Sequence, residues 1–186
     1  MVVEYSCWLY RCDTVVHISF KYDLVMKNIA LVAHDGRKKE LIDWVVYNMN
    51  ELKKHNLFAT GTTGKLIQAI ETDVQWDNAH NSKYCNHPFA SNVTCLKSGP
   101  LGGDQQIGAM IAEGKIDVLI FFCDNLITQG HQTDVSALTR LASLYNIAFA
   151  TNRTTADMIV TSPLLHDENY KRILPHAIEN YQNRVL

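Results

Sequence analysis

The strongest constraint on the fold is the run IDVLIFFC (residues 116–123), which is apolar at every position but one. A strand with one solvated face alternates between apolar and polar side chains, whereas a run without alternation is typical of a strand covered on both faces. Such a strand needs neighbouring strands and helices on each side. Shorter apolar runs that we expect to be those neighbours lie at residues 28–34, 57–60, 93–97 and 147–151.

Segments with helical spacing separate the apolar runs. Residues 38–49 and 134–145 both repeat apolar side chains every three or four positions. Further helices are expected at residues 65–70, 104–113, 155–160 and, on either side of Pro175, 170–186. Strands that alternate with helices predict an α/β protein, a three-layer αβα sandwich around a central, mainly parallel five-stranded sheet of Rossmann-like type.

The length of 186 residues suits one domain, and we expect residues 1–186 to form it with two additions. Residues 72–92 break the strand–helix rhythm and are rich in asparagine, so they are interpreted as a surface insertion. Residues 1–27 are an N-terminal extension, for which an edge strand is the only structural expectation.

Composition argues against several classes of partner. The net charge of −2 provides no basic surface for nucleic acid, and no apolar run approaches the roughly 20 residues that span a bilayer. The five cysteines are odd in number and lack CxxC spacing, which favours free thiols in a reducing compartment. The start of the chain has no basic segment followed by a clean apolar core, so we predict a cytoplasmic protein without a signal peptide.

Each predicted strand ends in a polar or glycine-rich cluster. The carboxyl ends of the strands of an open α/β sheet lie along one edge, where ligands usually bind, so the clusters predict a site there. The clusters are His34-Asp35, TGTTG (residues 60–64), SGPLGGD (residues 98–104), Asp124 and Thr151-Asn152.

Two of these clusters have alternative interpretations. TGTTG offers hydroxyls and backbone N–H groups at the start of a helix, which suits a phosphate, but an ordinary turn would have the same composition. The spacing GxxxxGK[ST] is missing, so TGTTG is not a nucleotide P-loop. Asp104 follows a stretch that contains Gly99, Gly102 and Gly103. It is either the N-cap of the next helix, with the glycines as turn formers, or a base beside a closely bound ligand.

Other polar residues are ambiguous by themselves. His131 precedes Asp134 by three positions in a polar loop, where a solvated surface histidine is the commoner outcome. In the insertion, His80, Cys85 and His87 match no ligand spacing of a known metal site, so a plain loop is preferred and no metal is expected.

The chain closely resembles the methylglyoxal synthase family. The matching segments lie in the family's order across most of residues 28–163, and GPLGGDQQIGA followed by an apolar strand is a specific signature. They are IALVAHDGRKK, LFATGTTGKLI, SGPLGGDQQIGAMIAEGKIDVLIFFCD, HQTDVSALTRLASLYNI and ATNRTTADMIVTSP. The resemblance implies a cofactor-free lyase that converts dihydroxyacetone phosphate into methylglyoxal and inorganic phosphate, a bypass of glycolysis. It also implies a homohexamer, with phosphate as product and as an inhibitor.

The resemblance assigns roles to residues. It implies that Asp104 is the catalytic base, that His34 and His131 are the active-site histidines, and that Asp35, Asp124 and Asp134 are supporting carboxylates. The residues implied in binding the substrate and its phosphate are His34, Lys38, Thr60, Thr62, Thr63, Ser98 and the amide of Gly99.

The sequence departs from the family before His131, where the family's prolines are replaced by Asn125, Gly130 and Thr133. A looser loop would hold His131 less firmly and lower turnover.

The rival hypothesis is a non-catalytic phosphate-sensing module of the same fold, like the effector domain of carbamoyl phosphate synthetase. Such a module needs the phosphate cradle but neither the base nor its histidine, so the presence of Asp104 and His131 favours the enzyme.

Overall fold

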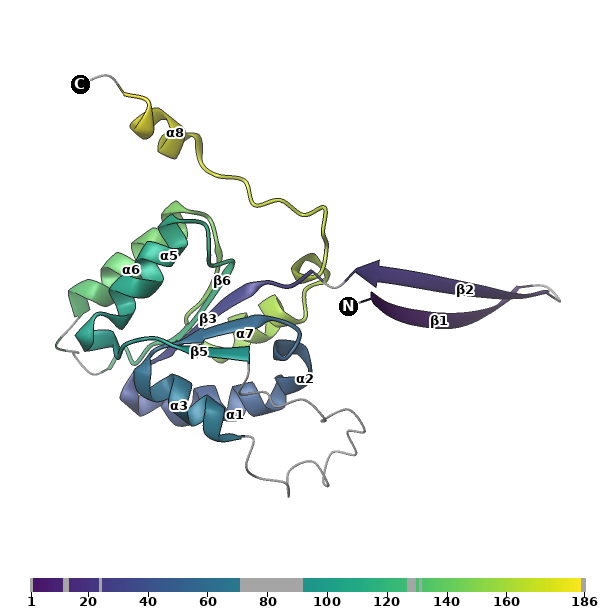
Figure 1. Ribbon diagram of the computed structural model, residues 1–186, viewed down its shortest axis with the longest axis horizontal. Coiled ribbons are helices and arrows are strands. Elements are labelled where there is room, and N and C mark those ends of the chain that lie inside the picture. The colour runs from purple at the N-terminus through teal and green to yellow at the C-terminus, as the bar shows by residue number, and fades with distance from the viewer. Residues whose placement is uncertain are drawn as a thin grey trace.

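The computed structural model describes residues 2–11, 14–23, 25–70, 92–126, 130 and 132–184. Five parallel strands form its central sheet in the order β5-β4-β3-β6-β7 (Figure 1). Their bounds are β3 Asn28–Ala33, β4 Asn56–Ala59, β5 Val93–Cys95, β6 Val118–Phe122 and β7 Ala148–Ala150. The predicted five-stranded parallel sheet is confirmed, and the run that suggested it, β6, is buried at every position.

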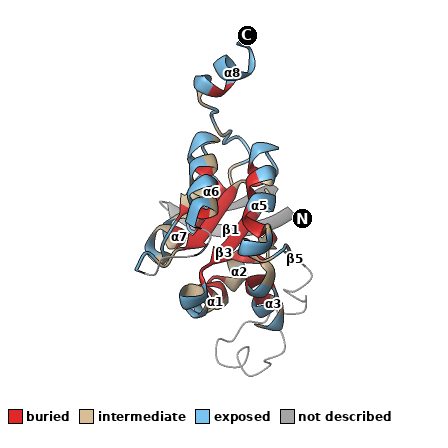
Figure 2. Cartoon of the chain, turned by 90° about the vertical axis from the view of Figure 1, so that its left-hand side faces the viewer, coloured by how far each residue is buried: buried red, intermediate tan, exposed pale blue. Residues whose placement is uncertain are grey.

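The helices cover both faces of the sheet, as the unbroken apolar strands require. Side chains of one strand alternate between two cores, so that Ile120 of β6 belongs to one core and Phe121 to the other. Helices α1 (Lys38–Tyr47), α3 (Gly61–Ala69) and α7 (Arg153–Val160) pack on one face, and α5 (Gly103–Ala112) and α6 (Gln132–Leu144) on the other. Figure 2 shows the buried residues concentrated between these layers.

Short elements connect the main ones. They are η1 Asp35–Arg37, α2 Met49–Leu52, η4 Gly99–Leu101, η5 Pro163–Leu165 and α8 His176–Gln182. Among the described residues, no helix is both long and apolar enough to cross a bilayer.

The structure corrects two of the predicted helix bounds. Helix α3 begins at Gly61 rather than near residue 65, so TGTTG is its first turn and not a separate loop. Residues 170–175 are not helical, because Pro175 has no N–H to donate and disfavours helical backbone in the residue before it. The Ile173 carbonyl instead accepts a bond from the Asn146 side chain.

The N-terminal extension forms a hairpin in the structure, whereas most of the predicted insertion lies outside the described residues. Strands β1 (Val2–Arg11) and β2 (Thr14–Asp23) form an antiparallel hairpin that is a sheet of its own, so the extension does not add the expected edge strand to the central sheet. Figure 1 shows this hairpin extending from the α/β layers. The predicted insertion lies outside the described residues except for Asn92, whose side chain donates to the Lys53 carbonyl.

Candidate active site

A cavity of about 710 Å³ opens at the carboxyl edge of the central sheet, where the sequence predicted a site. It collects side chains from the ends of β3, β4, β5 and β6 and from the start of α6. Its lining residues are Val32, Ala33, His34, Asp35, Lys38, Thr60, Thr62, Ser98, Gly99, Pro100, Asp104, Phe121, Gly130 and Asp134.

Two backbone groups hold His34 in place, one at the last residue of β6 and one two residues after it. Its N–H donates to the Phe122 carbonyl at 3.2 Å, and its Nδ1 accepts the Asp124 N–H at 2.9 Å. The ring is 5% exposed and stands edge-on to Phe121, with 5.0 Å between ring centroids. Because Nδ1 accepts a bond, a neutral His34 carries its proton on Nε2 and offers the cavity a donor.

Lys38 brings a positive charge to the cavity. It is the first residue of α1, and its Nζ contacts both Asp35 Oδ1 and Thr62 Oγ1. The ammonium therefore joins the end of β3 to the first turn of α3. A cation beside a helix N-terminus is an arrangement that favours a bound anion.

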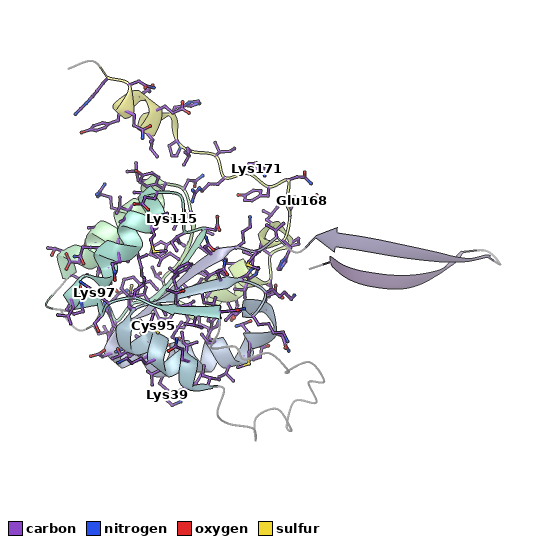
Figure 3. The ribbon with its side chains drawn as sticks, in the orientation of Figure 1. Lys39, Cys95, Lys97, Lys115, Glu168 and Lys171 are labelled. Carbon is purple, nitrogen blue, oxygen red and sulfur yellow. The ribbon has the colours of Figure 1, made fainter. Side chains whose placement is uncertain are left out.

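The TGTTG turn and the Ser98 loop meet through a glycine. A Cβ on Gly61 would come within 2.4 Å of Ser98 Oγ, so only glycine allows the two segments to approach this closely. The Gly61 N–H donates to the Lys97 carbonyl at 3.1 Å. Figure 3 labels Cys95 and Lys97, which mark where β5 ends and this loop begins.

The three threonines of TGTTG do not all face the cavity. Thr60 and Thr62 line it, whereas Thr63 does not and is only 1% exposed. Thr63 Oγ1 is buried and makes no hydrogen bond in the described part of the chain. Adjacent helical residues point about 100° apart, which explains why Thr62 and Thr63 differ.

Asp104 is buried, with 3% of its surface exposed, yet it lines the cavity. The structure separates the two interpretations of this residue. The N-cap of α5 is Gly102, whose φ of 100° suits glycine, and no side chain caps the helix. The Asp104 carboxylate lies instead against Gly99, where an added Cβ would be 3.0 Å from Oδ1 and 3.1 Å from Oδ2.

The remaining predicted residues are placed as follows. Asp134 lines the cavity from the first turn of α6. Asp124 is absent from the lining; its N–H holds His34, and its Oδ1 accepts the Leu126 N–H at 3.1 Å. His131 lies outside the described residues, although Gly130 beside it lines the cavity.

Sequence reasoning missed the apolar part of the lining. Val32, Ala33 and Phe121 belong to strands, and Pro100 follows the predicted phosphate-binding residues. Val32, Ala33 and Phe121 lie within the last two positions of β3 and β6, which is the signal that could have identified them, since the final residues of parallel strands border the ligand edge.

Comparisons with known proteins show what the chain is similar to. The family model described as the MGS-like domain matches residues 40–151. The chain is 52% identical to methylglyoxal synthase of Maridesulfovibrio salexigens over 146 residues, which is 77% of this chain and 88% of that protein. It is 51% identical to methylglyoxal synthase of Pseudoalteromonas atlantica, over 81% of this chain and 98% of that protein.

A solved structure is similar to this chain in fold and in sequence. The crystal structure of methylglyoxal synthase from Elizabethkingia anophelis NUHP1 aligns with a TM-score of 0.69 and 42% sequence identity. The alignment covers 87% of this chain and 93% of that chain.

Proposed function

The chain belongs to the methylglyoxal synthase family, and we propose that its 710 Å³ cavity holds the substrate with Asp104 as the catalytic base. The protein is a carbon–oxygen lyase that converts dihydroxyacetone phosphate to methylglyoxal and inorganic phosphate. The observation that carries the proposal for the site is the burial of Asp104 in the same cavity as Lys38, Thr60 and Thr62.

The first step removes a proton from the hydroxymethyl carbon beside the ketone. Asp104 accepts this proton, and the electron pair of the C–H bond forms an enediolate. The negative oxygen needs donors, which we assign to the Gly99 N–H and His131, with the Nε2–H of His34 as a further donor at the cavity. Asp134 would hold the tautomer of His131. Asp35 would support Lys38 through its carboxylate, and Asp124 would support His34 through its backbone N–H.

The second step expels phosphate. A proton first passes from the hydroxymethyl oxygen to the former ketone oxygen. The electron pair of the hydroxymethyl oxygen then forms the aldehyde C=O, the C=C pair moves to the next carbon–carbon bond, and the bond from carbon to the bridging phosphate oxygen breaks. The resulting enol takes up a proton at its terminal carbon to become methylglyoxal. Expulsion needs that C–O bond to stand perpendicular to the enediolate plane. Rigid binding of the phosphate therefore determines whether the intermediate eliminates or is reprotonated to an isomer.

The phosphate is assigned to the start of α3 and the Ser98 loop. Lys38, Thr60, Thr62 and Ser98 line this part of the cavity. Thr63 would contribute its backbone N–H, because its hydroxyl is buried away from the lining and the first N–H groups of a helix have no acceptor within it.

Finer properties are proposed from the family resemblance. They are a cytoplasmic location, a role in bypassing glycolysis, inhibition by phosphate and a homohexamer of a single domain with its extension and insertion. The exposed apolar residues of the C-terminal segment, Tyr170, Ile173, Leu174 and Tyr181, support an assembly of several copies.

The test mixes the purified protein with dihydroxyacetone phosphate and follows methylglyoxal and free phosphate together. Equal release of the two products is expected. Formation of glyceraldehyde 3-phosphate without free phosphate would contradict the proposed clamping of the leaving group. Phosphate binding without any turnover would instead fit the sensing module.

A further inference from the structure

Away from the cavity, three side chains that commonly bind metals converge at the opposite edge of the sheet. Glu51 lies in α2, His55 precedes β4, and His166 follows η5. One ligand atom from each lies within 4.8 Å of the other two. Since β4 runs from His55 towards Thr60 in the cavity, this Glu51–His55–His166 cluster is separated from the active site by the length of the strand.

The two distances from Glu51 to the histidines are close to those that a shared ligand needs. Glu51 Oε1 is 2.6 Å from His166 Nε2 and 3.9 Å from His55 Nε2. Ligand atoms that bind one tetrahedral zinc at about 2.0–2.1 Å lie about 3.3 Å apart. Each of the two pairs therefore needs a change of less than about 1 Å, which side-chain rotation supplies.

His55 provides the second observation that points to a ligand. Its side chain is completely buried, and its Nε2 faces Glu51 without a hydrogen bond in the described part of the chain. A buried polar atom left unbonded is costly, and native structures rarely retain one without a reason. The side chains of Glu51 and His166 are partly exposed, at 25% and 32%, so an ion has a path from solvent to the cluster, although Glu51 Oε1 itself is buried.

We propose that the Glu51–His55–His166 cluster binds a divalent transition-metal ion of the zinc type. Two imidazoles and one carboxylate are a ligand set that zinc uses, whereas magnesium and calcium prefer oxygen ligands alone. The other Glu51 oxygen, Oε2, is held by Lys54 Nζ at 2.7 Å, which leaves Oε1 for the ion.

The hydrogen bonds outside the cluster limit the affinity. His55 Nδ1 accepts the Lys27 N–H at 3.3 Å, so a neutral His55 carries its proton on Nε2 in the absence of an ion. Metal binding moves this proton to Nδ1 and gives up that long contact. His166 Nε2 lies 2.6 Å from Glu51 Oε1, so metal binding gives up this contact as well and moves the proton to Nδ1, which is buried and has no hydrogen-bond partner among the described residues.

The ion would be structural rather than catalytic. It would join the turn between α2 and β4 to the segment after α7, the point from which the chain runs towards α8. Zinc binding is therefore expected to raise the thermal unfolding midpoint, since a ligand that binds only the folded state stabilises it.

The test treats the full chain with chelator and titrates it with Zn²⁺ by calorimetry. All measurements use a variant chain, called the background chain, that carries His80→Asn, Cys85→Ser and His87→Asn, so that no histidine or cysteine of the insertion can bind the added metal. We expect Glu51→Gln and His166→Asn each to weaken Zn²⁺ binding by about 100-fold or more. Loss of a residue that only hydrogen-bonds to a ligand would weaken the binding less. The matched control is His176→Asn, a change at an exposed histidine of α8 that should leave binding intact.

Spectroscopy and unfolding complete the test. Co²⁺ at the same site should give visible bands of nitrogen and oxygen ligation without a thiolate charge-transfer band. Zn²⁺ should raise the unfolding midpoint of the background chain but not of the two variants, which should fold normally in chelator. The proposal is overturned by absence of binding, by binding that both variants retain, or by a thiolate band.

Discussion

At the residue scale, two glycines bring polar groups within contact distance. Gly61 permits the approach of Ser98, and Gly99 permits the approach of the Asp104 carboxylate. A larger residue at position 99 would displace the Asp104 carboxylate itself. The proposed base therefore owes its position to the absence of a neighbouring side chain, and not to a hydrogen bond that caps a helix.

Replacement of the base tests its role most directly. We expect Asp104→Asn to reduce kcat by about 10²–10⁴-fold, because general-base catalysis contributes about this much. Phosphate binding, measured by calorimetry, should be largely unchanged, since the amide retains the size of the carboxyl group. Asp43→Asn, at an exposed residue of α1, is the control. Loss of phosphate binding together with turnover would argue against the assigned role.

A substitution at Gly99 tests the placement of the base without changing its chemistry. An alanine Cβ there would be 3.0 Å from Asp104 Oδ1, so we expect the carboxylate to shift and kcat to fall about 10-fold or more. The unfolding midpoint should change little by comparison. Leu101→Ala alters an exposed side chain in the same turn and should keep normal turnover. Full activity in Gly99→Ala would show that the contact does not position Asp104.

At the element scale, the parallel strands have different polar groups at their two edges. The carboxyl edge carries the cavity, where helix N-termini such as that of α3 favour an anion. The amino edge carries the Glu51–His55–His166 cluster, in which His55 precedes β4 directly. Burial, more than the nearby His166, lowers the pKa of His55 to about 4, while Glu51 opposes this shift.

The pKa of His55 predicts how stability depends on pH. The unfolded chain binds a proton at this histidine near pH 6.5, but the folded chain resists it until about pH 4. Lys27 and Lys54 also disfavour the charged ring. The free energy of unfolding should therefore fall as the pH falls below 6.5, by about 2 kcal/mol at pH 5 relative to pH 7.5.

Denaturant unfolding at both pH values, in chelator, measures this change. His166→Asn should make the dependence shallower, because it removes one charge that opposes protonation of His55. His176→Asn should not alter the dependence, since that side chain is exposed. Equal stability at pH 5 and pH 7.5 would contradict the expected penalty for charging a buried ring.

At the scale of the whole molecule, the C-terminal segment stands apart from the layered domain. Figure 1 shows α8 at the end of an extended stretch that leaves the sheet and its helices. Tyr170, Ile173 and Tyr181 expose much of their surface in the single chain. Apolar side chains on a protruding segment are typical of a surface that packs against another subunit.

Sedimentation equilibrium tests the proposed assembly. Six copies of the 21.1 kDa chain have a mass of 6 × 21.1 kDa, about 127 kDa. We expect Ile173→Glu combined with Tyr181→Glu to produce a smaller species, because charge at a buried interface is costly. Met158→Glu, at an exposed apolar residue of α7, is the control. A monomeric wild-type chain would rule out the hexamer, and an unchanged mass in the double variant would place the interface elsewhere.

The sequence by itself determined the layers and the chemistry of the ligand edge. Apolar runs such as residues 116–123 can be stable only as covered strands, and helical periodicity fixes the segments between them. Residues that follow such strands share one edge, so the association of His34, Thr60, Ser98 and Asp104 could be predicted from order alone. These features depend on spacing within short stretches of the chain.

Only the tertiary structure decided which side chains meet and which turn away. The start of α3 at Gly61 directs Thr62 into the cavity and Thr63 into the core, although both belong to one short motif. The Glu51–His55–His166 cluster joins two residues that are four positions apart, Glu51 and His55, to His166, which lies far away in the sequence. Such contacts depend on how α2, β4 and η5 pack, and packing is a property of the whole fold that local periodicity does not encode.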